Sequence, residues 1–269
     1  MEKTIFDDLG GKKLVLGLIH LKPMPGTPFY EDGNLEASLK KALGDAKALQ
    51  NGGADGCLLQ SVDGIYGAED DTDYARVATL AMIAARVRDA TGPDFKIGVQ
   101  LMFNCITPSL AVAKAVNADF IRCSVLVGAS DSTYGPVVSN TLKVMNYRRQ
   151  IEAQNVGMIA EISGYHNKSG TEEGLVGALA STAMRAGANA VEVCSRDEAL
   201  NEQLVLSAKK AGEIPVILGG STTVENCQRR LRYADGALVG SEFEGGRWGG
   251  PVIESIVEQY CKKVRQIEG

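Results

Sequence analysis

Short apolar runs rich in β-branched residues alternate with amphipathic stretches along the whole of this chain of 269 residues. That alternation is typical of strand–helix units that build a parallel sheet, because crossover helices bury both faces of the strands. The pattern predicts eight strands, at residues 14–20, 56–60, 96–102, 120–124, 157–161, 190–194, 215–219 and 236–240.

The first stretch between two of these strands shows the helical pattern most clearly. Asn34 stands where an N-cap is expected, and Asn-Gly-Gly at residues 51–53 predicts the end of the helix. Between residues 35 and 50, one face of the predicted helix carries six apolar side chains, Leu35, Leu39, Ala42, Leu43, Ala46 and Leu49.

A second repeat concerns the residues that precede alternate strands. The pairs are Ala54-Asp55, Ala118-Asp119, Ala188-Asn189 and Ala234-Asp235. The same turn before every second strand fits a closed barrel, in which odd and even strands fill different packing layers. An open doubly wound sheet usually carries a glycine-rich dinucleotide fingerprint after its first strand, whereas here residues 20–23 are His-Leu-Lys-Pro. We therefore predict one (β/α)8 TIM-barrel domain spanning residues 1–269.

Charge and composition exclude several classes of protein. Lys and Arg total 28 against 33 Asp and Glu, so there is no global positive field to bind nucleic acid or an anionic membrane. Apolar runs such as residues 14–19 are far shorter than the roughly 20 residues that span a bilayer. Residues 1–13 lack the apolar core of a signal peptide. We expect a soluble cytoplasmic protein with no transmembrane segment and no nucleic-acid partner.

Two residue counts limit the chemistry. The chain has only two histidines, His20 and His166, which excludes a site of three histidine ligands. Its six cysteines are scattered without a C-x-x-C pair, so we interpret them as buried reduced thiols. Cys194 and Cys123 are candidate nucleophiles only if a base lies beside them.

Barrels of this kind often bind phosphate in the loops after the seventh and eighth strands. Residues 219–225 read Gly-Gly-Ser-Thr-Thr-Val-Glu, and residues 239–241 read Val-Gly-Ser. Glycines let backbone N–H groups approach an anion, and a helix starting there, with Thr222 and Glu225 as a capping box, would add its positive end. The alternative is that both segments are only turns. The predicted phosphate-binding residues are Gly219, Gly220, Ser221, Gly240 and Ser241.

Three side chains are the main reactive candidates. His20 ends the first strand, where an imidazole could serve as general acid or base, or else be a hydrogen-bonded structural residue. Glu161 and Glu192 are expected to point inward from neighbouring strands. They could form an acid/base pair or hold a divalent metal ion, the one cofactor for which the sequence offers candidate ligands. For Glu192 the alternative is an interior ion pair with Arg122.

Further polar groups are expected around the same pocket. Asn104 follows the third strand, and Lys22 could contact an anionic substrate from a proline-rich loop. We interpret the acidic residues 69–71 and Asp73 as a solvated loop, with metal binding as the alternative. Arg247 and Trp248 could cover the phosphate or pack at the surface of a homo-oligomer. The remaining candidates at strand ends are Gln60, Ser124, His166 and Cys194.

Residues 17–28, Gly-Leu-Ile-His-Leu-Lys-Pro-Met-Pro-Gly-Thr-Pro, resemble the opening segment of the BtpA/SgcQ family. The resemblance runs in patches from about residue 13 to 255. It implies a fold similar to the ribulose-phosphate-binding barrels. It also implies kinship with founding members linked to photosystem I biogenesis and with others that look like proteins of carbohydrate-utilisation operons. The further matching segments are 120–122 with Val125 and 128–129, 215–220, and 234–236 with 239–241.

The chain departs from the family pattern at the predicted reactive end. Residues 60–61 are Gln-Ser where the family tends to have Glu-Asn, and 103–105 are Phe-Asn-Cys in place of Arg-Asn-Asp, which keeps the asparagine at Asn104. Residues 161–166 are Glu-Ile-Ser-Gly-Tyr-His in place of Asp-x-His-x-Lys-His, and 194–195 are Cys-Ser where Thr-Gly is common. The phosphate end therefore resembles the family while the reactive end differs from it.

Together these features predict a barrel that binds a phosphorylated small metabolite, a sugar or ribose phosphate. The expected chemistry is that of an isomerase or lyase, by proton transfer next to a carbonyl group. His20 and Glu161 would be the acid/base groups, and Glu192 and Asn104 would polarise the substrate or hold a metal. Two alternatives stay open: a non-catalytic biogenesis factor for photosystem I or another membrane complex, and a nucleotide phosphohydrolase, which would need a strong metal site.

Overall fold

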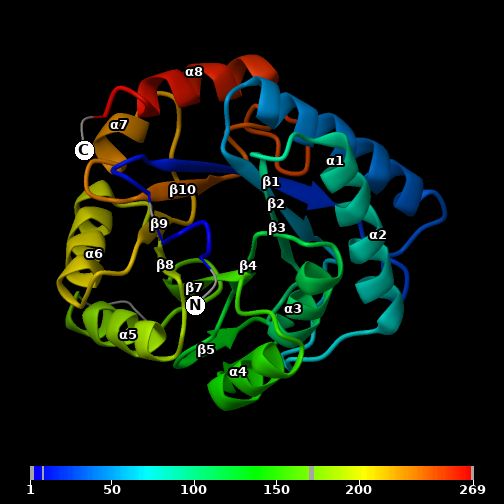
Figure 1. The fold of residues 1–269 in the computed structure, drawn as a ribbon, viewed down its shortest axis with the longest axis horizontal. Coiled ribbons are helices and arrows are strands. Elements are labelled where there is room, and N and C mark those ends of the chain that lie inside the picture. Colours follow the sequence, from blue (N-terminus) through cyan, green and yellow to red (C-terminus); the bar gives the residue numbers. More distant parts are fainter. Residues whose placement is uncertain (1–2, 8, 170–172, 268–269) are drawn as a thin grey trace.

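A computed structural model describes residues 3–7, 9–169 and 173–267. Its central feature is a closed barrel of eight parallel strands, and Figure 1 shows the helices arranged around it. All eight expected strands are present, and the predicted (β/α)8 barrel is confirmed. The strands are β1 (Leu14–Leu21), β2 (Gly56–Ser61), β3 (Lys96–Gln100), β4 (Phe120–Cys123), β7 (Gly157–Ser163), β8 (Ala190–Val193), β9 (Val216–Leu218) and β10 (Gly236–Val239).

The helices follow the strands in alternation. They are α1 (Asn34–Asn51), α2 (Tyr74–Ala90), α3 (Ile106–Ala115), α4 (Thr141–Gln150), α5 (Glu173–Arg185), α6 (Glu198–Lys210), α7 (Cys227–Arg230) and α8 (Glu254–Val264). Around the barrel the strands run in the order β1-β10-β9-β8-β7-β4-β3-β2, so β1 closes the ring by pairing with both β10 and β2.

Helix α1 differs from its prediction at its start and on its buried face. Its N-cap is Gly33, with φ 83°, and Asn34 is the first helical residue, so the expected side-chain cap was wrong. The end of the helix is confirmed at Gly52 and Gly53. The fully buried side includes Asp45, which is neutralised by Lys41 and accepts a hydrogen bond from the Val252 amide at 2.9 Å. Three of the predicted leucines are only partly buried, Leu35, Leu39 and Leu43.

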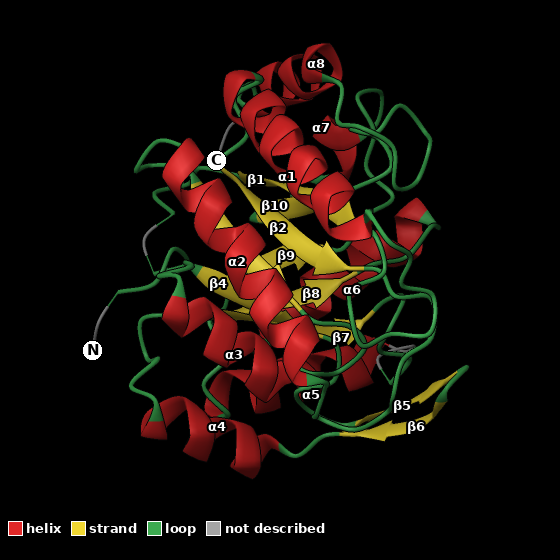
Figure 2. Cartoon of the chain, turned by 90° about the vertical axis from the view of Figure 1, so that its right-hand side faces the viewer, coloured by secondary structure: helices red, strands yellow, loops and turns green. Residues whose placement is uncertain are grey.

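A two-stranded antiparallel hairpin lies between β4 and α4 and was not predicted. It consists of β5 (Ala129–Ser132) and β6 (Gly135–Val138). Figure 2 shows it projecting from the body of the molecule, on the side opposite the N-terminal residues. The sequence gives little warning of it because each strand has four residues, with Ser, Asp, Gly and Pro among them, and no apolar run.

The interior of the barrel changes from apolar to charged along its axis. At the amino ends of the strands, Leu16, Phe120 and Ile217 are buried in one cluster. Phe6 packs edge-on against Phe120, with ring centroids 6.1 Å apart, so the N-terminal segment covers this end of the barrel (Figure 1). Toward the carboxyl ends the buried residues are polar or charged, among them Gln60, Gln100, Arg122, Glu161 and Glu192. Buried charges need partners, so this end is where a functional site is expected.

The Ala-Asp repeat has a structural cause at the amino ends of the strands. Each Asp or Asn side chain accepts a hydrogen bond from a backbone amide of the preceding strand. We call this link between a turn and the strand before it a clamp, and it occurs four times around the barrel. The acceptors and amides are Asp55 with Val15 (2.8 Å), Asp119 with Ile97 (2.8 Å), Asn189 with Met158 (3.1 Å) and Asp235 with Val216 (2.6 Å).

Each clamp also includes a basic side chain from the carboxyl end of an even-numbered helix. The repeating unit therefore joins a helix, the strand after it and the turn before the next strand. The pairs are Arg265, which directly follows α8, with Asp55; Arg88 with Asp119; Arg148 with Asn189; and Lys209 with Asp235.

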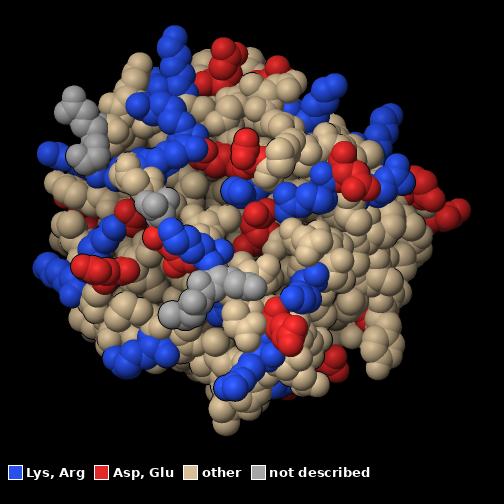
Figure 3. All heavy atoms as spheres, in the orientation of Figure 1, with Lys and Arg blue, Asp and Glu red and all other residues tan. Residues whose placement is uncertain are grey.

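Two surface properties bear on the expected partners. On the face seen in Figure 3, which is the face of Figure 1, basic and acidic side chains are intermixed rather than gathered by sign. Among the helices of the described residues, none has both the length and the apolar character that crossing a membrane requires.

Candidate active site

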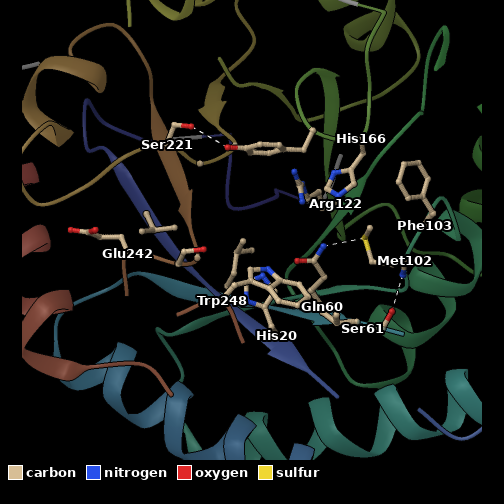
Figure 4. A pocket seen from close by; sticks show the side chains of 18 of the residues that line it. His20, Gln60, Ser61, Met102, Phe103, Arg122, His166, Ser221, Glu242 and Trp248 are labelled. Atoms are coloured by element: carbon tan, nitrogen blue, oxygen red, sulfur yellow. Dashed lines mark hydrogen bonds between the residues drawn. The ribbon is translucent and has the colours of Figure 1, made fainter. Parts of the chain in front are cut away.

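A cavity of about 750 Å³ opens at the carboxyl ends of the barrel strands. Figure 4 shows side chains from several strands and loops pointing into it. The structure brings together here most of the site that the sequence predicts. The predicted residues that line it are His20, Gln60, His166, Gly219, Gly220, Ser221, Gly240 and Ser241.

The glycine-rich loops after β9 and β10 form one end of the cavity. Among the described residues, the backbone amides of Gly220, Ser221, Gly240 and Ser241 have no hydrogen-bond partner. Gly220 has φ 124°, a conformation that favours glycine, and a Cβ at Gly219 would collide with the carboxylate of Glu192. These loops can therefore present unpaired N–H groups to an anion, as in other phosphate-binding loops.

The predicted helix start at this end was wrong in its details. The reciprocal cap joins Thr223 and Asn226, one residue beyond the expected Thr222 and Glu225, with the Thr223 amide 2.7 Å from Asn226 Oδ1. The helix that follows, α7, has only four residues, Cys227–Arg230. An anion bound here would thus be held by loop amides rather than by the dipole of a long helix.

Arg196 adds a positive charge to this end of the cavity. It is the third residue after β8, lines the cavity and is exposed, and none of the described acidic residues pairs with it. Glu242, also in the lining, is turned to the Val224 amide, which donates a hydrogen bond to Oε1 at 2.7 Å. The guanidinium of Arg196 is therefore available to an anionic ligand.

His20 is oriented by a buried carboxylate that sequence reasoning missed. Nδ1 of His20 lies 2.9 Å from Oε1 of Glu244, a residue that is only 1% exposed. Glu244 also accepts a hydrogen bond from the Gly249 amide at 3.0 Å, and Lys41 Nζ lies 3.7 Å away. A carboxylate beside Nδ1 fixes the proton on that nitrogen, which leaves Nε2 for the cavity.

His166 repeats the same arrangement across the cavity. Its Nδ1 lies 2.7 Å from Oε2 of Glu161, whose side chain is fully buried. The backbone amides of His166 and Asn167 both donate to Oε1 of Glu161, at 2.6 and 3.0 Å. The loop after β7 therefore wraps around this carboxylate, and Glu161 positions the ring of His166.

Arg122 links the two predicted carboxylates. Its Nε and Nη2 donate to the two oxygens of Glu192, at 2.6 and 2.5 Å, and Nη2 also donates to Glu161 at 3.0 Å. Among the described residues Nη1 has no partner, and Arg122 lines the cavity. The NH2 group at Nη1 of a buried guanidinium thus faces the cavity, and Figure 4 shows Arg122 beside His166 there.

The electrostatics of this network set the charge of each carboxylate. Burial alone would raise the pKa of Glu161, but His166, Arg122 and the Asn167 amide outweigh it and hold the pKa at about 2. Burial raises the pKa of Glu192, opposed by Arg122 and reinforced by the charge of Glu161. Burial also favours neutral Arg122, but the two carboxylates prevail and raise the pKa of its guanidinium, which stays charged.

Several predicted pocket residues lie behind the cavity wall or away from it. Asn104 Oδ1 accepts from the Val125 amide at 2.9 Å, and Ser124 donates to the Phe103 carbonyl at 2.7 Å, so both brace the loops after β3 and β4. Lys22 is exposed outside the lining. Cys194 is buried beside Ser221, and burial raises its thiol pKa. Burial likewise raises the pKa of Cys123, and all six cysteines are buried and free.

The structure offers little to a metal ion at the predicted carboxylates. Every carboxylate oxygen of Glu161 and Glu192 already accepts a hydrogen bond. Across residues 3–7, 9–169 and 173–267, no group of three or more His, Cys, Asp and Glu side chains could hold a metal. In the acidic run, Asp70 accepts from the Thr107 amide at 2.8 Å and Asp73 caps α2. These two carboxylates therefore accept hydrogen bonds from backbone amides at the N-termini of α3 and α2.

Three contributors to the cavity were missed by sequence reasoning. Glu244 sits 224 residues from His20, and nothing in the sequence pairs the two. Arg196 could have been found by its position after the sixth barrel strand, where loops reach the site. For Arg122, the expected ion pair with Glu192 is present, and what the sequence did not predict is that its Nη1 faces the cavity.

The comparisons with known proteins agree with this fold. The pattern of the BtpA family matches residues 11–267. An uncharacterised protein from Pyrococcus abyssi is 31% identical, covering 97% of this chain and 99% of that protein. The photosystem I biogenesis protein BtpA of Synechocystis is 26% identical, covering 86% of this chain and 80% of that protein. In structure, tryptophan synthase from Mycobacterium tuberculosis is similar at a TM-score of 0.66 and 14% identity, covering 98% of this chain and 99% of that chain.

Proposed function

The chain belongs to the BtpA family, and from its site we propose that it binds a phosphorylated sugar or ribose derivative and transfers a proton next to a carbonyl group. The observation that carries the proposal is the pairing of both histidines with buried carboxylates around one cavity. The amides of Gly220 and Gly240, with Arg196, supply an anion site at the other end of that cavity.

The proposed reaction follows from which groups can exchange a proton with the ligand and which can only donate a hydrogen bond to it. His20 and His166 both keep Nε2 for the ligand, so one ring can take a proton from a carbon next to a carbonyl while the other returns a proton to the neighbouring carbon or oxygen. The Nη1 N–H of Arg122 would donate to the oxygen on which negative charge develops. This gives the reaction class of an isomerase, or of a lyase if the second proton goes to a leaving group.

The roles differ from those that the sequence alone suggests. Glu161 and Glu192 are positioning residues here, because one fixes His166 and the other fixes Arg122. Asn104 supports the wall behind Phe103. The acid/base role falls to the two histidines, and the electrophilic role to Arg122.

The alternatives have less support from the geometry. A nucleotide phosphohydrolase needs a strong metal site, and the described residues form no such ligand group. An assembly role is suggested by the name of the Synechocystis relative, which is 26% identical. That role would use an exposed surface, whereas the buried ion pairs of this chain gather around a cavity.

Isothermal titration with pentose and hexose phosphates tests the proposal. We expect at least one of them to bind with a stoichiometry of one per chain, and the non-phosphorylated sugar to bind far more weakly. A His20→Gln, His166→Gln double variant should still bind the phosphate ester, because neither ring belongs to the anion site. Absence of binding by any sugar phosphate to the wild-type protein would overturn the proposal.

A further inference from the structure

The cavity ends in a corner of aromatic rings opposite its glycine-rich loops. Figure 4 shows Ser221 and Glu242 on one side of the cavity and Met102 and Phe103 on the other. Tyr66, Phe103 and Tyr134 all line the cavity at this second end. Their ring centroids lie 5.3 Å apart for Tyr66 and Tyr134, and 6.1 Å apart for Phe103 and Tyr134, at steep angles of 86° and 64°.

The rings are held so that they present carbon surface rather than hydroxyl groups. The hydroxyl of Tyr134 donates to the Gly64 carbonyl at 3.1 Å, and the hydroxyl of Tyr66 accepts from the Asp63 amide at 3.1 Å. Both phenols are therefore engaged with backbone. The apolar faces and edges of three differently inclined rings remain for a ligand.

Such a corner suits a planar unsaturated ring. Aromatic rings attract one another when offset-stacked or edge-to-face, with centroids about 4.5–7 Å apart. Three rings inclined to one another offer an entering ring a face on one side and an edge on another. Next to the corner, Gln60 donates from Nε2 to the sulfur of Met102 at 3.0 Å, and both residues line the cavity, so a polar amide borders the rings.

The size of the cavity also favours a ligand larger than a sugar phosphate. Its 750 Å³ lies in the upper part of the range of small-molecule sites, about 300–1,000 Å³. A sugar phosphate held at the glycine-rich loops would leave the aromatic end empty. The free energy of burial is gained only when an apolar wall leaves water, so a ligand group that covers these rings would bind more tightly than one that does not.

We propose that the natural ligand is a phosphorylated pentose that carries a planar aromatic or heteroaromatic ring at the end remote from its phosphate, as nucleoside 5′-monophosphates do. This inference rests on the proposed function, since it assumes the phosphate at the glycine-rich loops. The competing role for the aromatic corner is to anchor the β5–β6 hairpin, because Phe103 also packs with Val137. The two roles predict different binding data.

Calorimetric titration compares ribose 5-phosphate with its ring-bearing derivatives adenosine, uridine and nicotinamide mononucleotide. We expect at least one derivative to bind about tenfold more tightly than ribose 5-phosphate, from ring contacts alone. In Tyr134→Ala that advantage should fall severalfold while the affinity for ribose 5-phosphate is unchanged. Tyr134→Phe should keep most of it, because the ring remains although its hydrogen bond to the Gly64 carbonyl is lost. Tyr74→Ala, at a tyrosine that is 90% exposed and outside the cavity lining, is the matched control.

The outcomes separate this inference from the proposed function. If ribose 5-phosphate binds and no ring-bearing derivative binds more tightly to the wild-type protein, the ring inference is overturned and the proposed function stands. If Tyr134→Ala weakens ribose 5-phosphate and the derivatives equally, the corner is a hairpin anchor and the inference is again overturned. If no phosphate ester binds at all, the proposed function fails and the inference fails with it.

Discussion

At the scale of single residues, the carboxylates decide which groups can move protons. Glu161 has the position expected of an acid/base group, but a carboxyl with a pKa of about 2 stays ionised throughout the neutral range. It can orient and stabilise His166 without exchanging protons itself. The same roles apply to His20 and Glu244: the buried carboxylate lies on the Nδ1 side of the ring and orients it, while His20 exchanges the proton.

Glu244→Gln tests this division of roles. Loss of the negative charge beside His20 should slow proton transfer about a hundredfold, because the protonated imidazole loses its stabilising partner. The affinity for the phosphate ester should stay the same. Deuterium incorporation from D₂O into a bound sugar phosphate, followed by NMR, measures the first quantity, and calorimetry measures the second. Equal loss of affinity and rate would show that Glu244 only maintains the structure.

We expect Glu161→Gln to change how the free energy of unfolding depends on pH. The pKa of Glu161 is lowered from 4.5 in the unfolded chain to about 2 in the fold, so the network stabilises the protein above about pH 4.5, and this contribution is lost as the pH falls toward 2. At neutral pH it amounts to about 3 kcal/mol. The difference in free energy of unfolding between wild type and Glu161→Gln should therefore be largest near pH 7 and shrink below pH 4.5.

Urea unfolding at a series of pH values measures that difference. Glu258→Gln, at an exposed residue of α8, is the control and should follow the wild type at every pH. A Glu161→Gln deficit that stays constant from pH 7 to pH 3 would contradict the assignment of a low pKa to Glu161.

Residues that end a strand could be placed in the site from the sequence, because the strand pattern fixes where each strand ends. His20 and Gly240 are of this kind. The partners of such residues could not be inferred, since Glu244 approaches His20 only when the last loop folds back over the first strand. The charge of a site residue depends on such partners. The sequence therefore predicts where a residue lies better than it predicts its chemical role.

At the scale of elements, the fourfold clamp explains why the Ala-Asp turn recurs. Three of the four acceptors are aspartates, and the fourth is Asn189. Its basic partner Arg148 is buried, and burial lowers the pKa of that guanidinium. Arg148 donates to backbone carbonyls and to Asn189 Oδ1 at 3.2 Å, and has no carboxylate beside it among the described residues.

Asn189→Asp should therefore stabilise the protein. It restores the charge that the other three clamps have and places it against Arg148, for a gain of about 1 kcal/mol in free energy of unfolding. The gain should diminish at high salt. Asn155→Asp, at an exposed loop position, is the matched control and should leave stability unchanged. Destabilisation by Asn189→Asp in urea unfolding would show that the fourth clamp needs the amide.

The elements with strong periodicity were predictable, and those defined by long-range contacts were not. All eight barrel strands follow from short buried apolar runs. The β5–β6 hairpin does not, because Tyr134 at its tip is placed by a hydrogen bond to Gly64, 70 residues away. The buried face of α1 also differs, since Asp45 is drawn inward by contacts with the last loop of the barrel.

At the scale of the whole molecule, one end of the barrel is closed by the N-terminal segment and the other opens to the cavity. Trp248 is the one tryptophan of the chain, and its ring centroid lies 5.2 Å from that of His20. Its fluorescence should therefore report on ligands in the cavity. The same signal allows the anion site to be tested in variants.

Arg196→Gln should weaken binding of ribose 5-phosphate about fivefold to tenfold, because it removes the unpaired positive charge from the anion end. Its thermal stability should not change. Arg86→Gln, at an exposed arginine on α2 outside the cavity, removes the same charge elsewhere and should bind as the wild type does. Equal weakening in both variants would show that only the net charge of the protein matters.

A crystal structure of the protein with bound ribose 5-phosphate would show where the phosphate lies. We expect phosphate density within hydrogen-bonding distance of the amides of Gly220, Ser221, Gly240 and Ser241, with the sugar between His20 and His166. Phosphate bound elsewhere on the barrel, or an empty cavity at saturating ribose 5-phosphate, would contradict this expectation.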